Sequence, residues 1–402
     1  MQMQELGRLY TEANLADMKA YFIVQTVRQA EDLLDETTAA KAADFQRQLD
    51  SGKATAESAD NDNETTESED STNPLPVYYN DYVMKYMSDA YQQMYIAHYC
   101  TAAQKRDIKV MVEKVIAAFS DVVSESDWMS EETKAEAQAK LAAMGLHILY
   151  PDNLVDYTAL SFEDCNNLVD IVGAINAFQT SQLAAKVNQP VNRSNWDMSV
   201  IPTMMVNAIY AMNDNSINIC AALLSTEDFF SENNTYEQNL ACLGTVLGHE
   251  VTHGFDTTGY QYDKNGRYNS WWTNEDRYAF DSRADALVKY YSALTPVSRG
   301  AFLNGKTVSG EAIADMGGVK FALRIAAETP DFDYDAFFRA YAEMWRCHRT
   351  YMVETMYSSD SHPTGMLRTN VTLMQFDEFQ KTYDIQPGDG MYLSAEERIT
   401  VW

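Results

Sequence analysis

The chain has 402 residues and a formal net charge of −29 at pH 7, from 30 Lys and Arg against 59 Asp and Glu. This acidic excess argues against nucleic acid as a partner, because phosphate binding needs a basic surface, and against docking on anionic lipid. With 46 % hydrophobic residues, the chain can bury a sizeable core. It has no run of about 18 apolar residues, so no membrane segment is expected in this sequence.

The first residues lack a basic stretch followed by an apolar one, so the sequence as written carries no secretory signal and indicates a cytoplasmic protein. A missing upstream segment would instead place the protein in the cell envelope or outside the cell. The five cysteines are odd in number and form no C-x-x-C pair. Neither a disulfide scaffold nor a cysteine zinc site is therefore expected, and the oligomeric state is left open.

In chain order, residues 6–49 are rich in Ala, Leu, Gln and Glu and predict long helices. Residues 54–73 hold seven acidic residues and no Lys or Arg, which predicts a disordered acidic insertion. Residues 199–224 predict strands around a turn at 213–215. Further helices are expected, from apolar residues three and four apart, at 82–99, 103–119, 131–144, 237–255, 274–293, 310–327 and 334–357.

This pattern predicts a mainly α protein, of the α+β type, with a small sheet. We expect a division near Val155. Residues 1–154 would form a helical region of the kind that caps a catalytic domain. Residues 155–402 would form the catalytic domain itself, because they contain the candidate site residues described next.

A histidine pair forms the first part of that site. Residues 249–253 are H-E-V-T-H, and positions four apart lie on the same face of a helix. His249 and His253 can thus present two imidazoles to one Zn²⁺, which binds nitrogen at about 2.0–2.1 Å with a tetrahedral preference. Glu250 can reach a water molecule in the fourth position. The alternative is a helix that merely carries two surface histidines and a glutamate.

A catalytic zinc needs a third protein ligand, which a second predicted helix offers. Ser309 is predicted to cap a helix that begins at Gly310, and Glu311 and Asp315 then share one face. Glu311 would be the ligand, and Asp315 would accept a hydrogen bond from a ligand histidine. The alternative is that both acids only favour the helix dipole near its start.

The third part of the site is a loop, because Pro363 and Gly365 follow His362 closely. With Arg368 nearby, His362 could stabilise the oxyanion of a tetrahedral intermediate. The alternative is an exposed loop histidine without a role.

Together these segments resemble the neprilysin and endothelin-converting enzyme family of zinc metallopeptidases. Residues 206–210 (V-N-A-I-Y) look like the family's substrate strand, and residues 248–256 (G-H-E-V-T-H-G-F-D) look like its zinc helix. Residues 311–318 (E-A-I-A-D-M-G-G) are similar to its second helix. Residues 362–368 and the terminal Val401-Trp402 match its C-terminal end. The matches cover most of the chain in the family's order and spacing.

The resemblance implies a thermolysin-like catalytic domain with a partial helical cap, and one Zn²⁺ per chain. It implies an endopeptidase that cuts small peptides on the amino side of hydrophobic residues. The implied roles are zinc ligand for His249, His253 and Glu311, general base for Glu250, orientation of a ligand histidine for Asp315, and transition-state stabilisation for His362. The implied substrate-binding residues are Asn207, Ala208 and Arg368 for the peptide backbone, with Leu223, Phe229, Val246 and Trp345 for a hydrophobic pocket.

The similarity starts partway into the family's long N-terminal helical region, so roughly the first third of that pattern is expected to be absent here. Two alternatives to an active endopeptidase follow. One is a truncated, catalytically weak or inactive remnant that only binds peptides. The other is a zinc aminopeptidase with the same ligand pattern, which is disfavoured because no G-x-M-E-N motif for a substrate amine is visible.

Overall fold

In a computed structural model of the chain, placement is described for residues 75–190, 192, 196–226, 229–294, 303–350, 352–353 and 360–402. The helices expected at 6–49 and the acidic insertion expected at 54–73 lie outside the described residues. No helix in the described part is both long and apolar enough to cross a bilayer.

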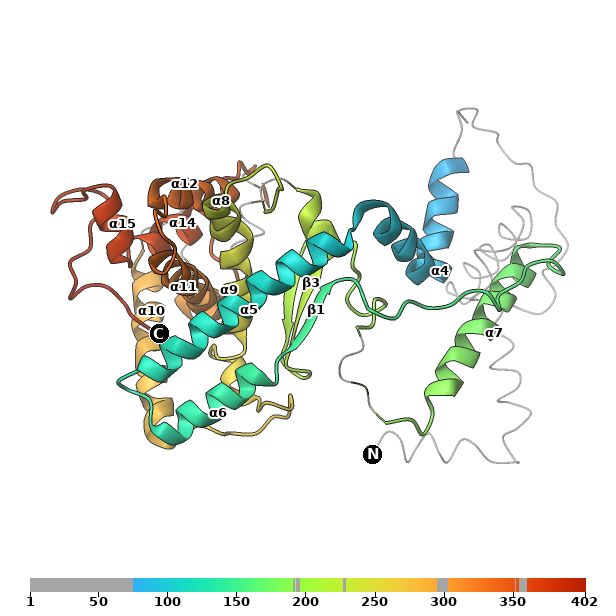
Figure 1. Ribbon diagram of the computed structural model, residues 1–402, viewed down its shortest axis with the longest axis horizontal. Helices are drawn as coiled ribbons and strands as arrows, with labels where there is room; N and C mark the ends of the chain where they lie inside the picture. The colour runs from blue at the N-terminus through green and yellow to red at the C-terminus, as the bar shows by residue number, and fades with distance from the viewer. Residues whose placement is uncertain are drawn as a thin grey trace, which may run out of the picture. The chain divides into compact units, whose positions relative to one another are not determined.

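The chain forms two compact units (Figure 1). Of the described residues, 75–88 and 155–190 belong to one unit, and 89–154 with those after residue 190 belong to the other. The division into 1–154 and 155–402 that the sequence suggests stays a prediction, and residues 89–154 group here with the C-terminal residues.

In the first unit, the described elements are the start of α4 (Leu75–Tyr99) and α7 (Leu168–Lys186). The two helices are joined where Gln179 Nε2 donates a hydrogen bond of 2.9 Å to the Tyr86 carbonyl. Helix α7 was not predicted. Its side chains are mostly exposed, with only three buried positions among nineteen, so the apolar periodicity that indicates a helix is weak here.

The second unit contains a three-stranded sheet in the order β1–β3–β2. Strand β1 (Gly145–Leu149) pairs in parallel with β3 (Ser216–Cys220), and β3 pairs in antiparallel fashion with β2 (Ala208–Ala211). The turn between β2 and β3 is where the sequence predicted it, whereas residues 199–207 form turns instead of a strand. Among the described strands none pairs with the other edge of β2, which therefore keeps free backbone groups.

Helices make up most of this unit, so the expected fold class, mainly helical with a small sheet, is confirmed. Helix α5 runs beside the sheet and the other helices (Figure 1). The helices, from the N-terminal side, are α5 (Ala102–Glu125), α6 (Glu131–Ala142), α8 (Tyr236–Asn239), α9 (Thr245–His253), α10 (Asn274–Ala293), α11 (Gly305–Ala327), α12 (Tyr334–Met344), α14 (Gly365–Leu373) and α15 (Asp377–Thr382).

An aromatic cluster at the centre of this unit joins distant parts of the chain. The ring of Phe119 on α5 lies 4.2 Å from that of Phe321 on α11 and 4.8 Å from that of Phe255, which follows α9. Trp402 closes the cluster at 5.2 Å from Phe119. Burial of such large rings is among the strongest contributions to a core, so the two helices that carry the site residues rest on a rigid base.

Several predicted helix boundaries are wrong. Helix α4 begins at Leu75 and not at residue 82, and α5 ends at Glu125 and not at residue 119. Helix α11 begins at Gly305, capped by Asn304, whose side chain accepts from the Lys306 N–H, so Ser309 is an interior residue and not the cap. Its hydroxyl donates instead to the Lys306 carbonyl. Helix α12 ends at Met344 and does not extend to residue 357.

Candidate active site

The H-E-V-T-H residues lie at the end of a continuous helical run. Helix α8 leads into a π-helical turn, η4 (Leu240–Gly244), and then into α9, as the sequence predicted for residues 237–255. His249 and Glu250 are each only 6 % exposed, so the alternative of a helix with surface histidines is excluded for them.

Glycines let α9 and α11 cross with their backbones in contact. A Cβ atom placed on Gly248 would lie 2.7 Å from Gly318 Cα, and one on Gly318 would lie 2.3 Å from the Thr245 carbonyl oxygen. Side chains would therefore force the helices apart. The close crossing brings the carboxylates of Glu311 and Asp315 on α11 to the histidines of α9.

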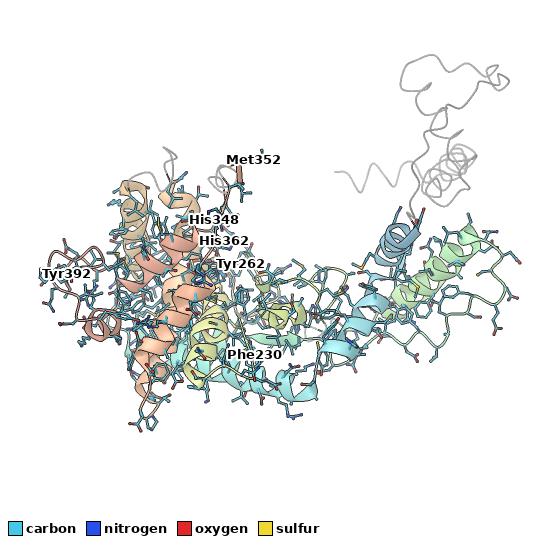
Figure 2. The ribbon with its side chains drawn as sticks, turned by 90° about the horizontal axis from the view of Figure 1, so that it is seen from above. Phe230, Tyr262, His348, Met352, His362 and Tyr392 are labelled. Atoms are coloured by element: carbon cyan, nitrogen blue, oxygen red, sulfur yellow. The ribbon has the colours of Figure 1, made fainter. Side chains whose placement is uncertain are left out.

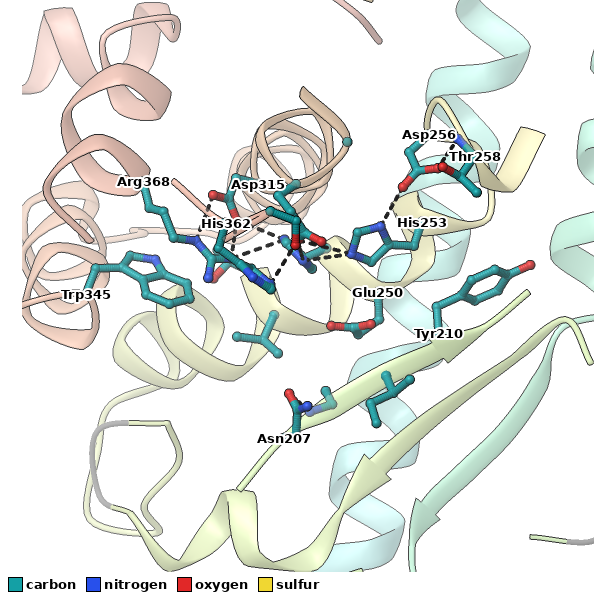
Figure 3. A pocket seen from close by; sticks show the side chains of 18 of the residues that line it. Asn207, Tyr210, Glu250, His253, Asp256, Thr258, Asp315, Trp345, His362 and Arg368 are labelled. Carbon is teal, nitrogen blue, oxygen red and sulfur yellow. Dashed lines mark hydrogen bonds and ion pairs between the residues drawn. The ribbon is translucent and has the colours of Figure 1, made fainter. Parts of the chain in front are cut away.

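Three donor atoms converge at this crossing, one of them from His253, which Figure 3 shows between Asp256 and the other contacts of the site. His249 Nε2 and His253 Nε2 are 3.0 Å apart, and Glu311 Oε2 lies 3.2 Å from the first and 3.5 Å from the second. Zinc–ligand bonds of about 2.0–2.1 Å in a tetrahedron require ligand atoms about 3.3–3.4 Å apart. The three observed separations bracket that value.

Each imidazole is held from its other side by a carboxylate. His249 Nδ1 lies 2.8 Å from Asp315 Oδ1, and His253 Nδ1 lies 2.7 Å from Asp256 Oδ2. Because an ionised carboxylate only accepts hydrogen bonds, each Nδ1–H donates, and this contact turns the Nε2 atom of each ring toward Glu311. Asp315 thus contacts His249, one of the two histidines that the sequence analysis expected as zinc ligands. Asp256 is a partner that the sequence analysis did not assign.

The carboxylates around the two histidines favour a positive charge at this place, on the rings themselves or on a bound ion. Burial and the neighbouring His253 act to lower the pKa of His249, but Asp315 and Glu311 outweigh them and raise it. Burial likewise acts to lower the pKa of His253, yet Asp256 and Glu311 raise it well above 6.5. Burial opposes ionisation of Glu311, but the two histidines hold its pKa far below its usual value. Protons and a metal ion therefore compete for the same lone pairs.

A zinc ion fits this donor set. Glu311 Oε2 is buried and makes no hydrogen bond of acceptable geometry, so a cation is its natural partner. Glu250 also has a ligand atom within 4.8 Å of those of His249 and His253. Glu311 Oε2, at 3.2 and 3.5 Å from the two Nε2 atoms, lies near the separation that a tetrahedral zinc site requires, which favours Glu311 as the candidate third ligand. This assignment leaves the carboxylate of Glu250 available for proton transfer.

Arg368 on α14 pairs with the second carboxylate of the site. Its Nε and Nη2 atoms lie 2.9 and 2.5 Å from the two oxygens of Asp315, a bidentate arrangement. Its guanidinium also stacks 3.6 Å from the centre of the Trp345 ring, and its carbonyl accepts from the Tyr341 hydroxyl at 3.1 Å. Although burial opposes ionisation of Asp315, Arg368 and His249 hold its pKa low. Asp315 therefore remains an anion.

His362, labelled in Figure 2, has a side chain that is 45 % exposed. Its Nδ1 is 2.8 Å from Asp360 Oδ1, and its Nε2 is 3.2 Å from Glu311 Oε2. Burial acts to raise the pKa of Asp360, but hydrogen bonds from His362 outweigh it and lower that pKa. The contact with Asp360 thus holds the His362 ring so that its Nε2 faces Glu311, one of the candidate metal ligands.

A cleft of about 570 Å³ joins these residues to a candidate substrate surface. All thirteen predicted site residues line it, and the structure brings every one of them together. The sequence analysis did not assign a role to several other lining residues. Tyr341 and Lys306 are two of these, and no local motif marks them. Asp256 follows His253 by three residues, but α9 ends at His253, so this spacing alone does not place the acid beside the histidine.

Similar proteins include several zinc metallopeptidases. The neutral endopeptidase of Lactococcus lactis is 32 % identical over 323 residues, which cover 80 % of this chain and 51 % of that protein. Neprilysin-2 of Drosophila melanogaster is 30 % identical, with 77 % of this chain and 42 % of that protein covered. This chain thus spans about half the length of the curated relatives it matches.

Solved structures also match. The zinc metalloprotease Zmp1 of Mycobacterium tuberculosis, in its open state, aligns with a TM-score of 0.82 at 26 % identity, over 99 % of this chain and 61 % of that one. PepO from Lactobacillus rhamnosis aligns with a TM-score of 0.70 at 27 % identity, over 98 % of this chain and 60 % of that one.

Two family models with the description Peptidase family M13 match the chain, one over residues 207–399 and one over residues 2–151. The first span contains all thirteen predicted site residues. With relatives named neprilysin and neutral endopeptidase, these matches confirm the resemblance seen in the sequence. The chain belongs to peptidase family M13.

Proposed function

We propose that this chain is a zinc-dependent endopeptidase that hydrolyses small peptides on the amino side of hydrophobic residues. The observation that supports this best is the convergence of His249 Nε2, His253 Nε2 and Glu311 Oε2 within 3.0–3.5 Å, in a cleft also lined by Glu250. Two imidazoles and one carboxylate around an open position form the ligand set of catalytic zinc in peptidases.

When bound, zinc would act as a Lewis acid on the scissile carbonyl and lower the pKa of a water molecule. Glu250 takes the proton from the attacking water and passes it to the leaving amine. Glu250 follows His249 on α9. A carboxylate oxygen of Glu250 lies within 4.8 Å of the ligand nitrogens of His249 and His253, which supports this role.

His362 would stabilise the developing oxyanion. When its Nδ1–H donates to Asp360, a protonated ring still has an Nε2–H to donate to the reacting oxygen. Asp315 does not touch the substrate in this proposal. It orients His249 and balances the charge of Arg368, whose position on the cleft wall allows it to brace a substrate carbonyl.

The substrate backbone would bind along β2. The edge of β2 opposite β3 is free among the described strands, and Asn207 and Ala208 line the cleft. A peptide can add to such an edge as an extra strand. The four predicted pocket residues also line the cleft and offer apolar surface to a substrate side chain: Leu223, Phe229, Val246 and Trp345. This apolar wall is the basis for the proposed preference for a hydrophobic residue.

The test is hydrolysis of an amino-blocked fluorogenic peptide that contains one hydrophobic residue. The unmodified chain should cleave it before that residue, a chelator should abolish the activity, and added zinc should restore it. Glu250→Gln should keep stoichiometric zinc but lower kcat by several orders of magnitude, since it cannot accept the proton. Glu275→Gln, at an exposed position of α10, is the matched control and should retain full activity.

Near-normal turnover by Glu250→Gln would refute the role of this residue. Zinc and peptide binding without any hydrolysis would favour the alternative of an inactive remnant. Cleavage only of peptides with a free amino terminus would favour an aminopeptidase. His253→Ala should abolish stoichiometric zinc, which metal analysis would show.

A further inference from the structure

Lys140 is a buried cation far from the metal ligands in sequence. It lies in the last turn of α6 and is only 1 % exposed. No carboxylate of the described residues forms an ion pair with it. Its Nζ instead donates three short hydrogen bonds, to the carbonyls of Gly254, Gly259 and Tyr262, at 2.6, 2.8 and 2.6 Å. An ammonium has three N–H donors, so all of them are used.

Aromatic rings complete the surroundings of this ammonium. The ring centres of Phe255 and Trp271 lie 5.3 and 5.7 Å from Nζ, within reach of a cation–π attraction. The Trp271 indole N–H donates to the Tyr262 carbonyl that Lys140 also contacts. Burial of a lysine is costly, and these carbonyls and rings offset part of that cost.

The three carbonyls belong to one segment, which runs from Gly254 to Tyr262 directly after α9 (Tyr262 is labelled in Figure 2). The segment folds back tightly, since a Cβ atom on Gly259 would lie 1.7 Å from the His253 carbonyl oxygen. Without the ammonium, three inward-facing carbonyls would have to find other donors. Lys140 is thus the common donor to three carbonyls of this segment.

The same segment carries Asp256, and its backbone fixes that side chain. Asp256 Oδ1 accepts from the N–H groups of Thr258 and Gly259, at 2.8 and 2.7 Å. The other oxygen, Oδ2, is then left to accept from His253 Nδ1. Gly259 thus offers its N–H to Asp256 and its carbonyl to Lys140. One peptide segment connects the buried cation to the ring of a candidate ligand.

We propose that Lys140 is a positioning residue for the metal site, which holds the segment 254–262 so that Asp256 orients His253 toward the ion. This inference rests on the proposed zinc site. It assigns to α6 an influence on metal affinity without any contact between Lys140 and the ion. Loss of outer partners of a metal ligand lowers affinity by about 10–100-fold, and a more remote partner belongs at the lower end.

The experiment measures zinc dissociation constants by competition with a chromophoric chelator, on the full chain and well below each variant's unfolding temperature. Lys140→Met keeps the length of the side chain but removes the charge and the donors. We expect its zinc affinity to fall about tenfold. The visible spectrum of the cobalt-substituted protein should also change, because His253 is no longer held in one orientation. Lys134→Met on the same helix removes only a contact with the exposed Glu131, and should leave both readouts unchanged.

The outcomes are distinct. Unmodified protein that binds no zinc would overturn the proposed function itself. Zinc binding by the unmodified chain, with equal affinity and spectrum in Lys140→Met, would overturn the role of Lys140 alone. If Lys140→Met does not fold, Lys140→Gln, which keeps two N–H donors without the charge, is measured against the same criterion.

Discussion

The crossing of α9 and α11 makes a quantitative prediction at Gly318. A Cβ atom there would lie 2.3 Å from the Thr245 carbonyl oxygen and 3.1 Å from the backbone nitrogen of His249. Relief of this overlap requires the helices to separate by about 1 Å, because non-bonded atoms settle near van der Waals distance. The hydrogen bond between His249 Nδ1 and Asp315 Oδ1, now 2.8 Å, would then stretch beyond useful length.

We therefore expect Gly318→Ala to weaken zinc binding by about 10–100-fold, the range for loss of a ligand's outer partner. Overpacking of the crossing should also lower the free energy of unfolding by about 1–3 kcal/mol. Zinc affinity is measured by chelator competition, and stability by urea unfolding of the zinc-free protein. Gly173→Ala in α7 is the matched control, because no atom lies within 4 Å of its added Cβ. That variant should bind zinc normally and be unchanged or more stable by about 0.5–1 kcal/mol.

Wild-type zinc affinity and stability in Gly318→Ala would refute the argument that close backbone contact sets the site geometry. A loss of stability with unchanged zinc affinity would show that the crossing serves packing alone. Only a joint loss, absent from Gly173→Ala, supports the geometric reasoning.

Three further predictions concern charge. Arg368→Met leaves the buried Asp315 carboxylate without its cation and should lower the free energy of unfolding, measured in urea, by about 3–5 kcal/mol. The double variant with Asp315→Asn should lose less than the sum of the two single losses, and strict additivity would contradict the pairing. Burial lowers the pKa of Lys140 to about 7, so the zinc-free folded chain binds fewer protons than the unfolded one between pH 7 and 10.5. Its unfolding free energy should rise through that window by up to about 1.4 kcal/mol per pH unit, and equal slopes in Lys140→Met would contradict this. Added zinc should raise the melting temperature of the unmodified chain but not that of His253→Ala, and a chelator should reverse the rise.

The sequence predicted the parts of the site whose geometry is local. His249 and His253 are one helical turn apart, as are Glu311 and Asp315, so any helix through them aligns each pair on one face. Helix α10 was predicted with its observed bounds from apolar residues three and four apart, and in the structure Thr273 caps it. These features need no knowledge of the rest of the chain.

Features that depend on distant partners were missed. Strand β1 exists because it pairs with β3, about 70 residues later in the chain, and five residues alone give little signal of that pairing. The start of α11 was placed at Gly310 because Ser309 is as good a cap as Asn304 by residue type, and only the structure decides between them. The displaced start also removes the dipole alternative, since Glu311 lies beyond the first turn of the observed helix.

Asp256 shows the same limit within the site itself. An acid three residues after a helical histidine has no fixed relation to it once the helix has ended. Its contact with His253 exists because the chain folds back after α9, and Lys140, 114 residues away from Gly254, holds that fold. Each candidate ligand histidine is thus oriented by a different structural feature. The glycine crossing with α11 places Asp315 against His249, whereas a buried ammonium on α6 places Asp256 against His253. Because these two features share no residue, the metal site depends on the packing of three helices, α6, α9 and α11. The H-E-V-T-H motif provides only the part of the site that is local to α9.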